Sequence, residues 1–321
     1  MAKPKLSLQQ QQRIAQRQAK AVRSGNELDL KTGIVLAQFG KELQLTLADQ
    51  PDQVLVAKIR ASLPKLVTGD RVWFRQNPEQ QAIIEHLQPR SSILTRPDHR
   101  GKLKEVAANI DLMVIVASLY PETPINLIDR YLVAAKICQI QPLLVLNKTD
   151  LEAGQELGSF FPYYQQRLGI LSLHCSHLDQ ASITKLQQQI ASKTSILVGL
   201  SGAGKSSLIH ALTQEDSIRV AAVSDATGKG KHTTTTTQLY FHHDSMIIDS
   251  PGVRDFSLEH ATLEQIKAGF PDIQQLAMHC RFNNCSHLHE PDCAVKNASP
   301  EKLHPLRWQS YMQILNSISN K

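Results

Sequence analysis

The amino-acid sequence predicts a multidomain fold: an N-terminal β-barrel of the OB type, a central α/β domain and a mostly helical, metal-binding C-terminal domain. Short apolar strands occupy residues 32 to about 90, strands and helices alternate after them, and cysteines cluster near the end. The 321 residues suffice for two or three domains with their own cores. We set the boundaries at 1–27, 28–90, 91–268 and 269–321, the first range being a basic disordered arm.

The first 26 residues carry the whole net charge of +6. Six of the 35 Lys and Arg lie in this arm, which has no acid, and the other 29 balance the 29 Asp and Glu that follow. A Gln-rich arm with few large apolar residues cannot fold alone. It either binds nucleic acid through phosphates or is a solubilising terminus. The chain has no apolar run of the ~20 residues that span a membrane and no secretion-signal pattern, so we expect a cytoplasmic protein.

Five segments between Thr32 and about Arg90 predict the barrel. They read GIVLAQF, LQLTLA, VLVAKI, DRVWFR and AIIEHL, separated by turn-prone stretches. Five such strands favour a Greek-key barrel of the OB type, which often binds RNA or DNA. Trp73 and Phe74 could form a stacking surface for bases, but an aromatic in a small barrel is more often core, and we expect that of one of the two.

Beyond about Ser91 the pattern favours βαβ units with a parallel sheet. The segments DLMVIVAS and PLLVLNKTD have the composition of buried strands, and residues 125–140 have the spacing of a crossover helix between them. The residues Asn147, Lys148, Thr149 and Asp150 then follow the carboxyl end of the second strand. Open α/β sheets bind their ligands at that edge.

A phosphate-binding loop of the pattern GxxxxGK[ST] lies between the strand SILV and the helix SSLIHAL. Backbone amides of such a loop surround the phosphates, Lys205 would neutralise β and γ oxygens, and the Ser206 hydroxyl would coordinate magnesium. Ser207 is a candidate for a contact with the α-phosphate. The remaining loop residues are Gly199, Leu200, Ser201, Gly202, Ala203 and Gly204.

A second phosphate-sensing element is the strand MIID with the turn SPG behind it. Asp249 would hold magnesium through water, and the Gly252 amide would sense the γ-phosphate. Between the two elements, residues 228–237 read GKGKHTTTTT, which suggests a mobile switch or, as the alternative, an ordinary polar loop. One threonine of this run, here taken as Thr234, would complete the magnesium shell when GTP is bound.

The NKTD sequence predicts guanine selectivity. The carboxylate of Asp150 can accept hydrogen bonds from guanine N1 and N2, whereas adenine N1 is itself an acceptor. Asn147 would brace the loops and contact the purine edge, and the stem of Lys148 would pack on the base. The loop LHCSHLD could bring a backbone amide of Cys175 or Ser176 to guanine O6.

The order of these motifs is inverted. Ordinary small GTPases have the phosphate loop first, DxxG second and NKxD last, whereas this chain has NKTD, GLSGAGKSS and DSPG in that order. We therefore predict a circularly permuted GTPase domain.

Many GTPases follow DxxG with a glutamine that orients the attacking water, but this chain has Val253 there. His232, beside the threonine run, is the nearest candidate for a catalytic substitute, although a lone loop histidine is usually a surface residue.

Three thiolates and one imidazole within 14 residues form a closed tetrahedral set, which favours a structural zinc ion. The candidate ligands are Cys280, Cys285, His287 and Cys293, with His279 and His289 as neighbouring alternatives. Apolar residues near helical spacing behind the cluster predict a terminal helix that packs on it. These are Leu303, Trp308, Tyr311, Met312, Leu315 and Ile318.

Together, NKTD, GLSGAGKSS, KHTTT, DSPGVRDF and CxxxxCxHxxxxxC, behind a barrel ending in RSSILTRP, resemble the RsgA (YjeQ) family over nearly the full length. Its members are circularly permuted GTPases that assist maturation of the bacterial small ribosomal subunit. The resemblance implies GTP/GDP, Mg²⁺ and one structural Zn²⁺ as cofactors. It also implies that the protein contacts the subunit and its rRNA, and that the subunit stimulates GTP hydrolysis, after which the protein is released. The resemblance further implies a monomer.

The sequence also bears on two alternative functions. Val253 leaves open an RNA-binding module whose GTP site only sets the affinity for RNA, while Asp150 disfavours an unrelated P-loop ATPase or kinase.

Cys175 and Ser176 stand where the family more often has Ser and Ala. The permutation puts the DSPG switch directly before the zinc domain, so nucleotide state could bias that domain's position.

Overall fold

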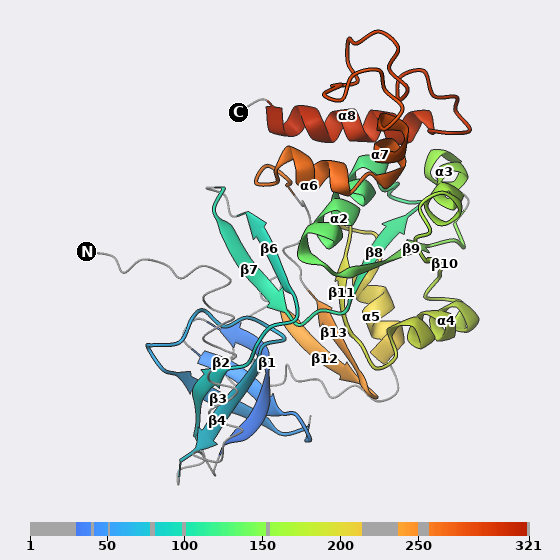
Figure 1. The fold of residues 1–321 in the computed structure, drawn as a ribbon. Coiled ribbons are helices and arrows are strands. Elements are labelled where there is room, and N and C mark those ends of the chain that lie inside the picture. The colour runs from blue at the N-terminus through green and yellow to red at the C-terminus, as the bar shows by residue number, and fades with distance from the viewer. Residues whose placement is uncertain are drawn as a thin grey trace.

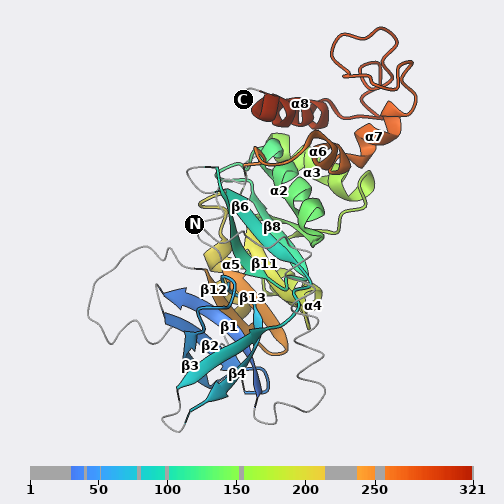
Figure 2. The same cartoon turned by 60° about the vertical axis from the view of Figure 1, so that its left-hand side comes forward.

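The structure is a computed structural model that describes residues 30–39, 42–50, 52–77, 81–97, 101–151, 155–213, 237–249 and 257–319. The barrel lies at one end, an α/β sheet in the middle, and the C-terminal helices with a long loop at the other end (Figures 1 and 2). The basic arm, residues 228–236 with His232 and Thr234, and Gly252 lie outside these ranges. Within the ranges, none of the helices combines the length and apolarity that crossing a bilayer requires.

Five strands form a closed barrel with the order β1-β2-β3-β5-β4. They are β1 (Lys31–Phe39), β2 (Glu42–Leu47), β3 (Val54–Ile59), β4 (Arg71–Gln76) and β5 (Ala82–Leu87). Strand β1 closes the barrel on β4, and β3 and β5 are its parallel pair, which is the OB topology. Phe74 is fully buried in the barrel core, whereas Trp73 is half-buried and meets His86 edge-on. The expectation that one of these two aromatics is core is confirmed.

A six-stranded sheet with the order β10-β9-β8-β11-β13-β12 forms the centre of the molecule. Its strands are β8 (Leu112–Ser118), β9 (Gln141–Asn147), β10 (Ser172–His174), β11 (Thr194–Val198), β12 (Gln238–His242) and β13 (Ser245–Asp249). Only the edge pair β12 and β13 is antiparallel. Every residue of β8 and β11 is buried, as expected for parallel strands covered on both faces.

Alternating residues of the central strands face two separate cores. Ile115 and Leu144 pack with α2 (Ile125–Cys138) and α3 (Gln155–Gln166) on one face. Val114 and Leu143 pack with α4 (Gln180–Ile190) and α5 (Lys205–Thr213) on the other. The predicted crossover helix between the two buried strands is α2.

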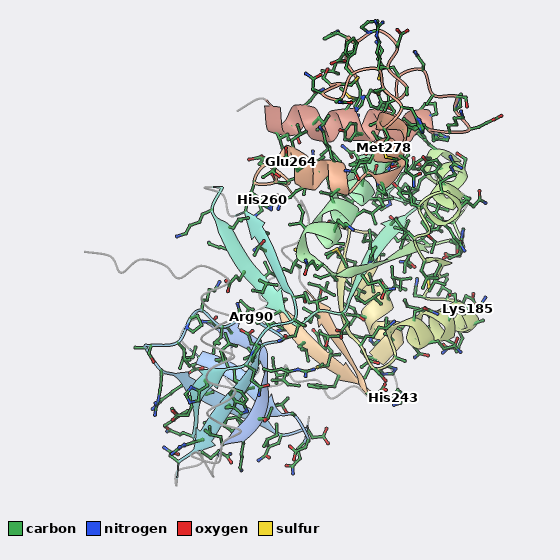
Figure 3. The ribbon with its side chains drawn as sticks, in the orientation of Figure 1. Arg90, Lys185, His243, His260, Glu264 and Met278 are labelled. Carbon is green, nitrogen blue, oxygen red and sulfur yellow. The ribbon has the colours of Figure 1, made fainter. Side chains whose placement is uncertain are left out.

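A hairpin of β6 (Ile93–Pro97) and β7 (Leu103–Ala108) joins the barrel to the sheet. Arg90, at this junction in Figure 3, donates from Nε to Asp70 in the barrel at 2.7 Å and from Nη1 to Glu105 on β7 at 3.0 Å. The Asp70 carboxylate is fully buried. The Ala108 amide adds a bond to the Thr68 carbonyl at 2.9 Å. These contacts hold the barrel in a fixed orientation on the hairpin.

The C-terminal part consists of α6 (Leu263–Ala268), α7 (Pro271–Ala277), the cysteine-containing loop and α8 (Pro305–Ser319). Helix α6 begins with a capping box in which Thr262 and Gln265 satisfy each other's backbone amides. Tyr311 of α8 lies beside Cys285 and His287, in agreement with the prediction that the terminal helix packs on the cluster. Helix α8 also packs along α2 of the central domain, a contact that the sequence did not predict.

Candidate functional site

The NKTD residues and the phosphate loop, far apart in sequence, touch at the carboxyl edge of the sheet. Asn147 is the last residue of β9, and its buried side-chain amide donates to the Ala203 carbonyl at 2.8 Å. The Lys148 ammonium donates to the Gly202 carbonyl at 2.6 Å and to the Tyr120 carbonyl at 2.8 Å. The two predicted motifs therefore form one site, at the edge where open α/β sheets bind ligands.

Glycine is required at two positions of the phosphate loop. At Gly204 the backbone φ is +91°, and an added Cβ would lie 2.3 Å from the Asn147 amide nitrogen. At Gly199 an added Cβ would lie 2.2 Å from the Val116 carbonyl oxygen. No other residue fits such contacts without displacing backbone or the buried amide. The glycines thus allow the loop to approach both β8 and the NKTD segment.

A cation and a carboxylate stand together beside the loop. Lys205 opens α5, and its ammonium donates to the carbonyls of Gly199 at 2.9 Å and Leu200 at 2.8 Å. Asp249 ends β13, paired with Leu197 of β11. Burial raises the pKa of the Asp249 carboxyl, and the positive charge of Lys205 partly offsets this rise. This pair could hold a phosphate group and a divalent cation, for which carboxylates and phosphate oxygens are suitable ligands.

The first turn of α5 presents polar groups at its amino end. Ser206 and Ser207 are exposed there, and Ser201 is exposed in the loop before them. The first helical amides have no partner within a helix, so a helix start attracts anions. The backbone and hydroxyl groups of this turn could therefore contact phosphates.

The base-reading end of the site is built from two neighbouring loops. Thr149 donates from its amide, at 3.3 Å, and from its hydroxyl, at 3.1 Å, to the Cys175 carbonyl. The Asp150 side chain is exposed, and a hydrogen bond from the Ser176 side chain is the first cause that holds the pKa of its carboxyl below the usual range. An ionised Asp150 is the acceptor that guanine N1 and N2 require.

The two amides predicted to reach guanine O6 donate within the protein. The Cys175 amide bonds to the Leu146 carbonyl at 2.8 Å, and the Ser176 amide bonds to the Ser182 hydroxyl at 3.1 Å. The contact with O6 stays a prediction. Ser182 and Tyr120 are site neighbours that sequence reasoning missed, because no motif contains them and only the fold brings them to this edge.

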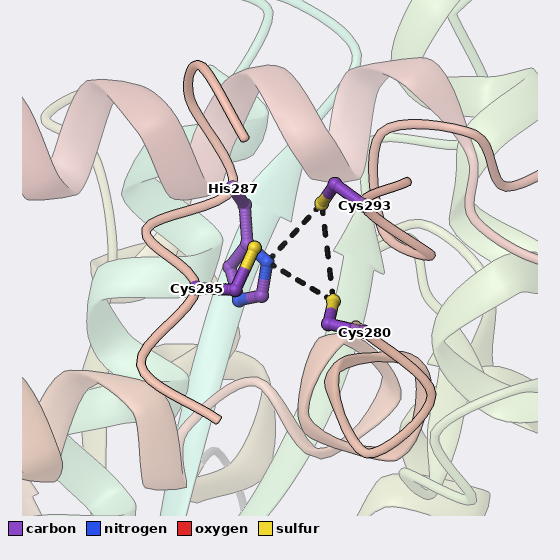
Figure 4. A group of neighbouring side chains, drawn as sticks. All are labelled: Cys280, Cys285, His287 and Cys293. Atoms are coloured by element: carbon purple, nitrogen blue, oxygen red, sulfur yellow. Dashed lines mark hydrogen bonds between the residues drawn. The ribbon is translucent and has the colours of Figure 1, made fainter. Parts of the chain in front are cut away.

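The three cysteines and His287 also meet, in the loop between α7 and α8 (Figure 4). Their ligand atoms all lie within 4.8 Å of one another, whereas His279 and His289 are outside this group and exposed. The sulfurs of Cys280 and Cys293 are 3.9 Å apart, and the His287 Nδ1 lies 3.6 and 3.4 Å from them. A tetrahedral zinc ion puts two sulfurs about 3.8 Å apart and sulfur and nitrogen about 3.5 Å apart. The donor set therefore fits such an ion.

The fold and the joined motifs define a circularly permuted P-loop GTPase. Residues 87–259 match the family model described as RsgA GTPase. The small ribosomal subunit biogenesis GTPase RsgA of Azotobacter vinelandii is 44% identical over 316 residues, which cover 95% of this chain and 92% of that protein. The protein of the same name from Hahella chejuensis is 40% identical over 342 residues, covering 100% and 98%. The chain therefore belongs to the RsgA GTPase family.

Solved structures agree with this assignment. The crystal structure of YjeQ from Thermotoga maritima matches with a TM-score of 0.71 and 26% identity, covering 91% of this chain and 99% of that chain. YloQ, a circularly permuted GTPase, matches with a TM-score of 0.68 over 92% of this chain and 97% of that chain, and at 22% identity it supports the fold. The family resemblance and the permutation predicted from the motif order are confirmed.

Proposed function

We propose that this GTPase binds the small ribosomal subunit, assists its late maturation and leaves the subunit after hydrolysing GTP. The observation that carries the proposal is the contact of Asn147 and Lys148 with the phosphate loop, which joins base reading and phosphate binding in one site. The names of the relatives support the subunit as the partner. A ribosomal partner also implies a cytoplasmic protein, which we expect to act as a monomer in contact with rRNA.

The proposed roles follow from the chemistry of each side chain. Lys205 neutralises phosphate oxygens, while Ser206 and Asp249 hold Mg²⁺, whose charge offsets the negative charge of the phosphates. Ser207 and the loop amides add phosphate contacts. Asp150 reads guanine, and Lys148, held by two carbonyls, supplies a stem on which the base packs.

We propose a structural Zn²⁺ at the Cys₃His group. All four positions of a tetrahedral ion are filled by protein ligands, which leaves no site for a reacting water. Of the four ligands, Cys285, His287 and Cys293 are buried. The ion would therefore stabilise the loop between α7 and α8 rather than take part in hydrolysis.

The residue that follows DSPG cannot orient the attacking water. Val253 stands where many GTPases have glutamine, and an apolar side chain cannot position water. His232 remains the candidate from the sequence for this role. The switch threonine Thr234 remains a candidate for the magnesium shell, and the Gly252 amide for the γ-phosphate. Replacing His232 with Ala should reduce the subunit-stimulated rate, and an unchanged rate would remove it from the mechanism.

The first experiment is the GTP hydrolysis rate with and without purified small subunits. We expect a slow basal rate that rises many-fold with subunits, loss of GTP use in Asp150→Asn, and little use of ATP. A rate that does not respond to saturating subunits would favour the second candidate function, a nucleotide-gated RNA-binding module, which Val253 supports. The next measurement would then be RNA affinity in the GTP and GDP states.

A further inference from the structure

Helix α2 connects the nucleotide site to the C-terminal segment. Its first residue, Ile125, follows a turn that lies against the phosphate loop. Its second turn carries Asp129, which pairs with Arg307 on α8. The contact of α2 with α8 lies in the half of the molecule that is remote from the barrel (Figure 1). One short piece of chain thus reaches both the nucleotide site and the segment with the Cys₃His group.

The turn of residues 118–123 is held by buried hydroxyl groups. The Ser118 hydroxyl donates to the Pro121 carbonyl at 2.6 Å, and the Thr123 hydroxyl accepts from the Ser118 amide at 2.9 Å. Both hydroxyl-bearing residues are buried. The Thr123 amide also donates to the Ser118 carbonyl at 3.0 Å. The next residue, Pro124, is the N-cap of α2, so the turn and the start of α2 form one rigid unit.

The tip of this turn contacts both halves of the nucleotide site. The Tyr120 carbonyl accepts from the Lys148 ammonium at 2.8 Å, and the same ammonium donates to the Gly202 carbonyl at 2.6 Å. A Cβ added to Gly202 would lie 3.4 Å from the Pro121 ring, so the turn packs against the phosphate loop as well. Lys148 is the side chain to which we assign the base. A nucleotide that immobilises Lys148 therefore also immobilises the turn.

At the other end of this unit, Asp129 belongs to a buried network that joins four helices. Its carboxylate pairs with Arg307 of α8 and accepts from the Tyr164 hydroxyl of α3 at 3.0 Å. The adjacent Tyr163 hydroxyl donates to Asp272 of α7 at 3.0 Å, and Asp272 accepts from Arg307 Nε at the same distance. The two tyrosine hydroxyls thus orient the two carboxylates that hold α8.

The docking of α8 on α2 has two discrete states, because the buried pair of Asp129 and Arg307 is either formed or broken. An intermediate separation would leave charges without a partner in surroundings that water does not reach, which is strongly unfavourable. A ligand shifts such an equilibrium when it favours one of the two states. An immobilised start of α2 presents Asp129 where Arg307 requires it, so a nucleotide should favour the docked state.

We propose that Asp129 and Arg307 couple guanine-nucleotide binding to the docking of α8. A bound nucleotide fixes Lys148, the turn and the start of α2, which reduces the entropy lost when α8 docks. Because the coupling acts through Lys148, it requires the nucleoside but not the γ-phosphate. It is therefore separate from any effect of the DSPG segment, which would sense the γ-phosphate. The inference rests on the proposed role of Lys148 and goes beyond the proposed function.

Hydrogen exchange of the α8 amides tests the coupling in the full-length protein. The amides used are those that exchange faster than the amides of β8, because they report local opening of α8 and not unfolding of the whole protein. GDP should slow their exchange by about fivefold or more, the lower end of typical couplings between two sites. A non-hydrolysable GTP analogue should slow it by the same factor.

Two results with the natural chain would overturn the proposal. Slowing by the GTP analogue alone would assign the effect to the DSPG segment. Binding of GDP without slower exchange in α8 would show that the two sites are independent. In contrast, a chain that does not bind GDP would refute the nucleotide site itself, so the two failures are distinguishable.

The variant is Tyr163→Phe with Tyr164→Phe, which keeps both rings and removes the hydroxyls that orient the carboxylates. The control, Ser159→Ala, removes a hydroxyl of the same helix that donates to the Glu156 carbonyl within α3 at 2.9 Å. A merely structural role would speed exchange equally with and without GDP. Coupling predicts that the ratio of the two exchange rates falls from about fivefold towards one in the variant and not in the control. An equal ratio in all three proteins would contradict it.

Reciprocity provides a second measurement. Arg307→Ala removes the cation of the buried pair, so α8 loses its attachment to Asp129. Coupling between two sites acts equally in both directions, so this variant should bind GDP more weakly by the factor by which GDP slows α8 exchange in the natural chain. Calorimetric titration with GDP measures the affinity, and unchanged affinity would overturn the proposal. If Arg307→Ala does not fold, Tyr164→Phe alone should show the same fall in the exchange ratio as the double variant.

Discussion

Arg307 on α8 and Asp129 on α2 form an ion pair in which both side chains are fully buried. Asp272 on α7 accepts a second bond from Arg307 Nε at 3.0 Å, and the guanidinium lies 3.9 Å from the centre of the Phe270 ring. The segment with the Cys₃His group is thus attached to the GTPase domain by charges that water does not reach. If nucleotide state changes the position of this segment, α2 has to move with it or the pair has to break.

Replacing Arg307 with Ala should strongly destabilise the protein. The substitution leaves two carboxylates without their buried cation, and breaking a buried pair costs about 3–5 kcal/mol. Urea unfolding measures this loss. The control is Arg60→Ala, which removes an ion pair whose arginine is 56% exposed and should cost no more than about 1 kcal/mol. Equal losses in the two variants would contradict the structural role of the buried pair.

Gly204→Ala should impair GTP binding at least tenfold while most of the fold persists. The added methyl would collide with the Asn147 amide at 2.3 Å and would also require an unfavourable positive φ. Nucleotide titration by fluorescence measures the affinity. Gly158→Ala on α3 is the matched control, because its nearest neighbour is a Leu119 methyl at 3.8 Å. Wild-type affinity in Gly204→Ala would show that the loop and NKTD need not touch.

The purified protein should contain one zinc ion per chain. Cys285→Ser should lose it and unfold locally around α7 and α8, because its sulfur belongs to the four-atom donor set. Elemental analysis and native-state hydrogen exchange report the two effects. Cys138→Ser, which changes a cysteine outside the set, should keep the metal. Equal metal content in all three proteins would mean that the ion is bound elsewhere or not at all.

The docking of α8 should weaken at acidic pH through His304. Burial lowers the pKa of this imidazole, which packs against Phe160 with ring centres 4.7 Å apart and tilted by 60°, and whose Nδ1 accepts from the Leu306 amide. Its folded pKa is depressed, so the unfolded chain binds the proton more readily. The contribution of His304 to stability is therefore complete above about pH 6.5, and it is lost as the pH falls towards the lowered pKa of the folded state.

His304→Phe tests this dependence, because the ring contact remains and the titration disappears. The drop in thermal midpoint between about pH 7.5 and about pH 5.5 should be smaller in the variant than in the natural chain. An identical drop would assign the acid sensitivity to other groups.

The parts that could be predicted from sequence are those with local signals. Alternating apolar residues predicted the barrel strands, and the carboxyl end of a buried strand correctly placed Asn147 at the sheet edge. The phosphate loop between SILV and SSLIHAL became β11, loop and α5. Each of these signals depends on neighbours in the chain and on backbone geometry that the motif itself imposes.

The parts that escaped prediction depend on long-range contacts. Helix α3 contains Pro162, and β6 and β7 contain charged residues. None of these three segments therefore shows a clear periodicity of apolar residues. Arg307 lies four residues before Tyr311, on the apolar side of the terminal helix, but an arginine is rarely fully buried unless it is paired. Its complete burial follows only when Asp129 and Asp272, which lie on other helices, approach it.

Strand β11 lies inside the sheet, so the sheet cannot be complete until β11 has been synthesised. Strand β11 pairs with β8 on one side and with β13 on the other. Of the strands of this sheet, β8, β9 and β10 leave the ribosome first. Strand β8 then has an open edge until residues 194–198 arrive. Unpaired strand edges are the points at which nascent chains associate wrongly. Insertion of β11 closes that edge and brings the phosphate loop to Asn147 in one event, so the nucleotide site forms only in chains in which the edge of β8 is already paired.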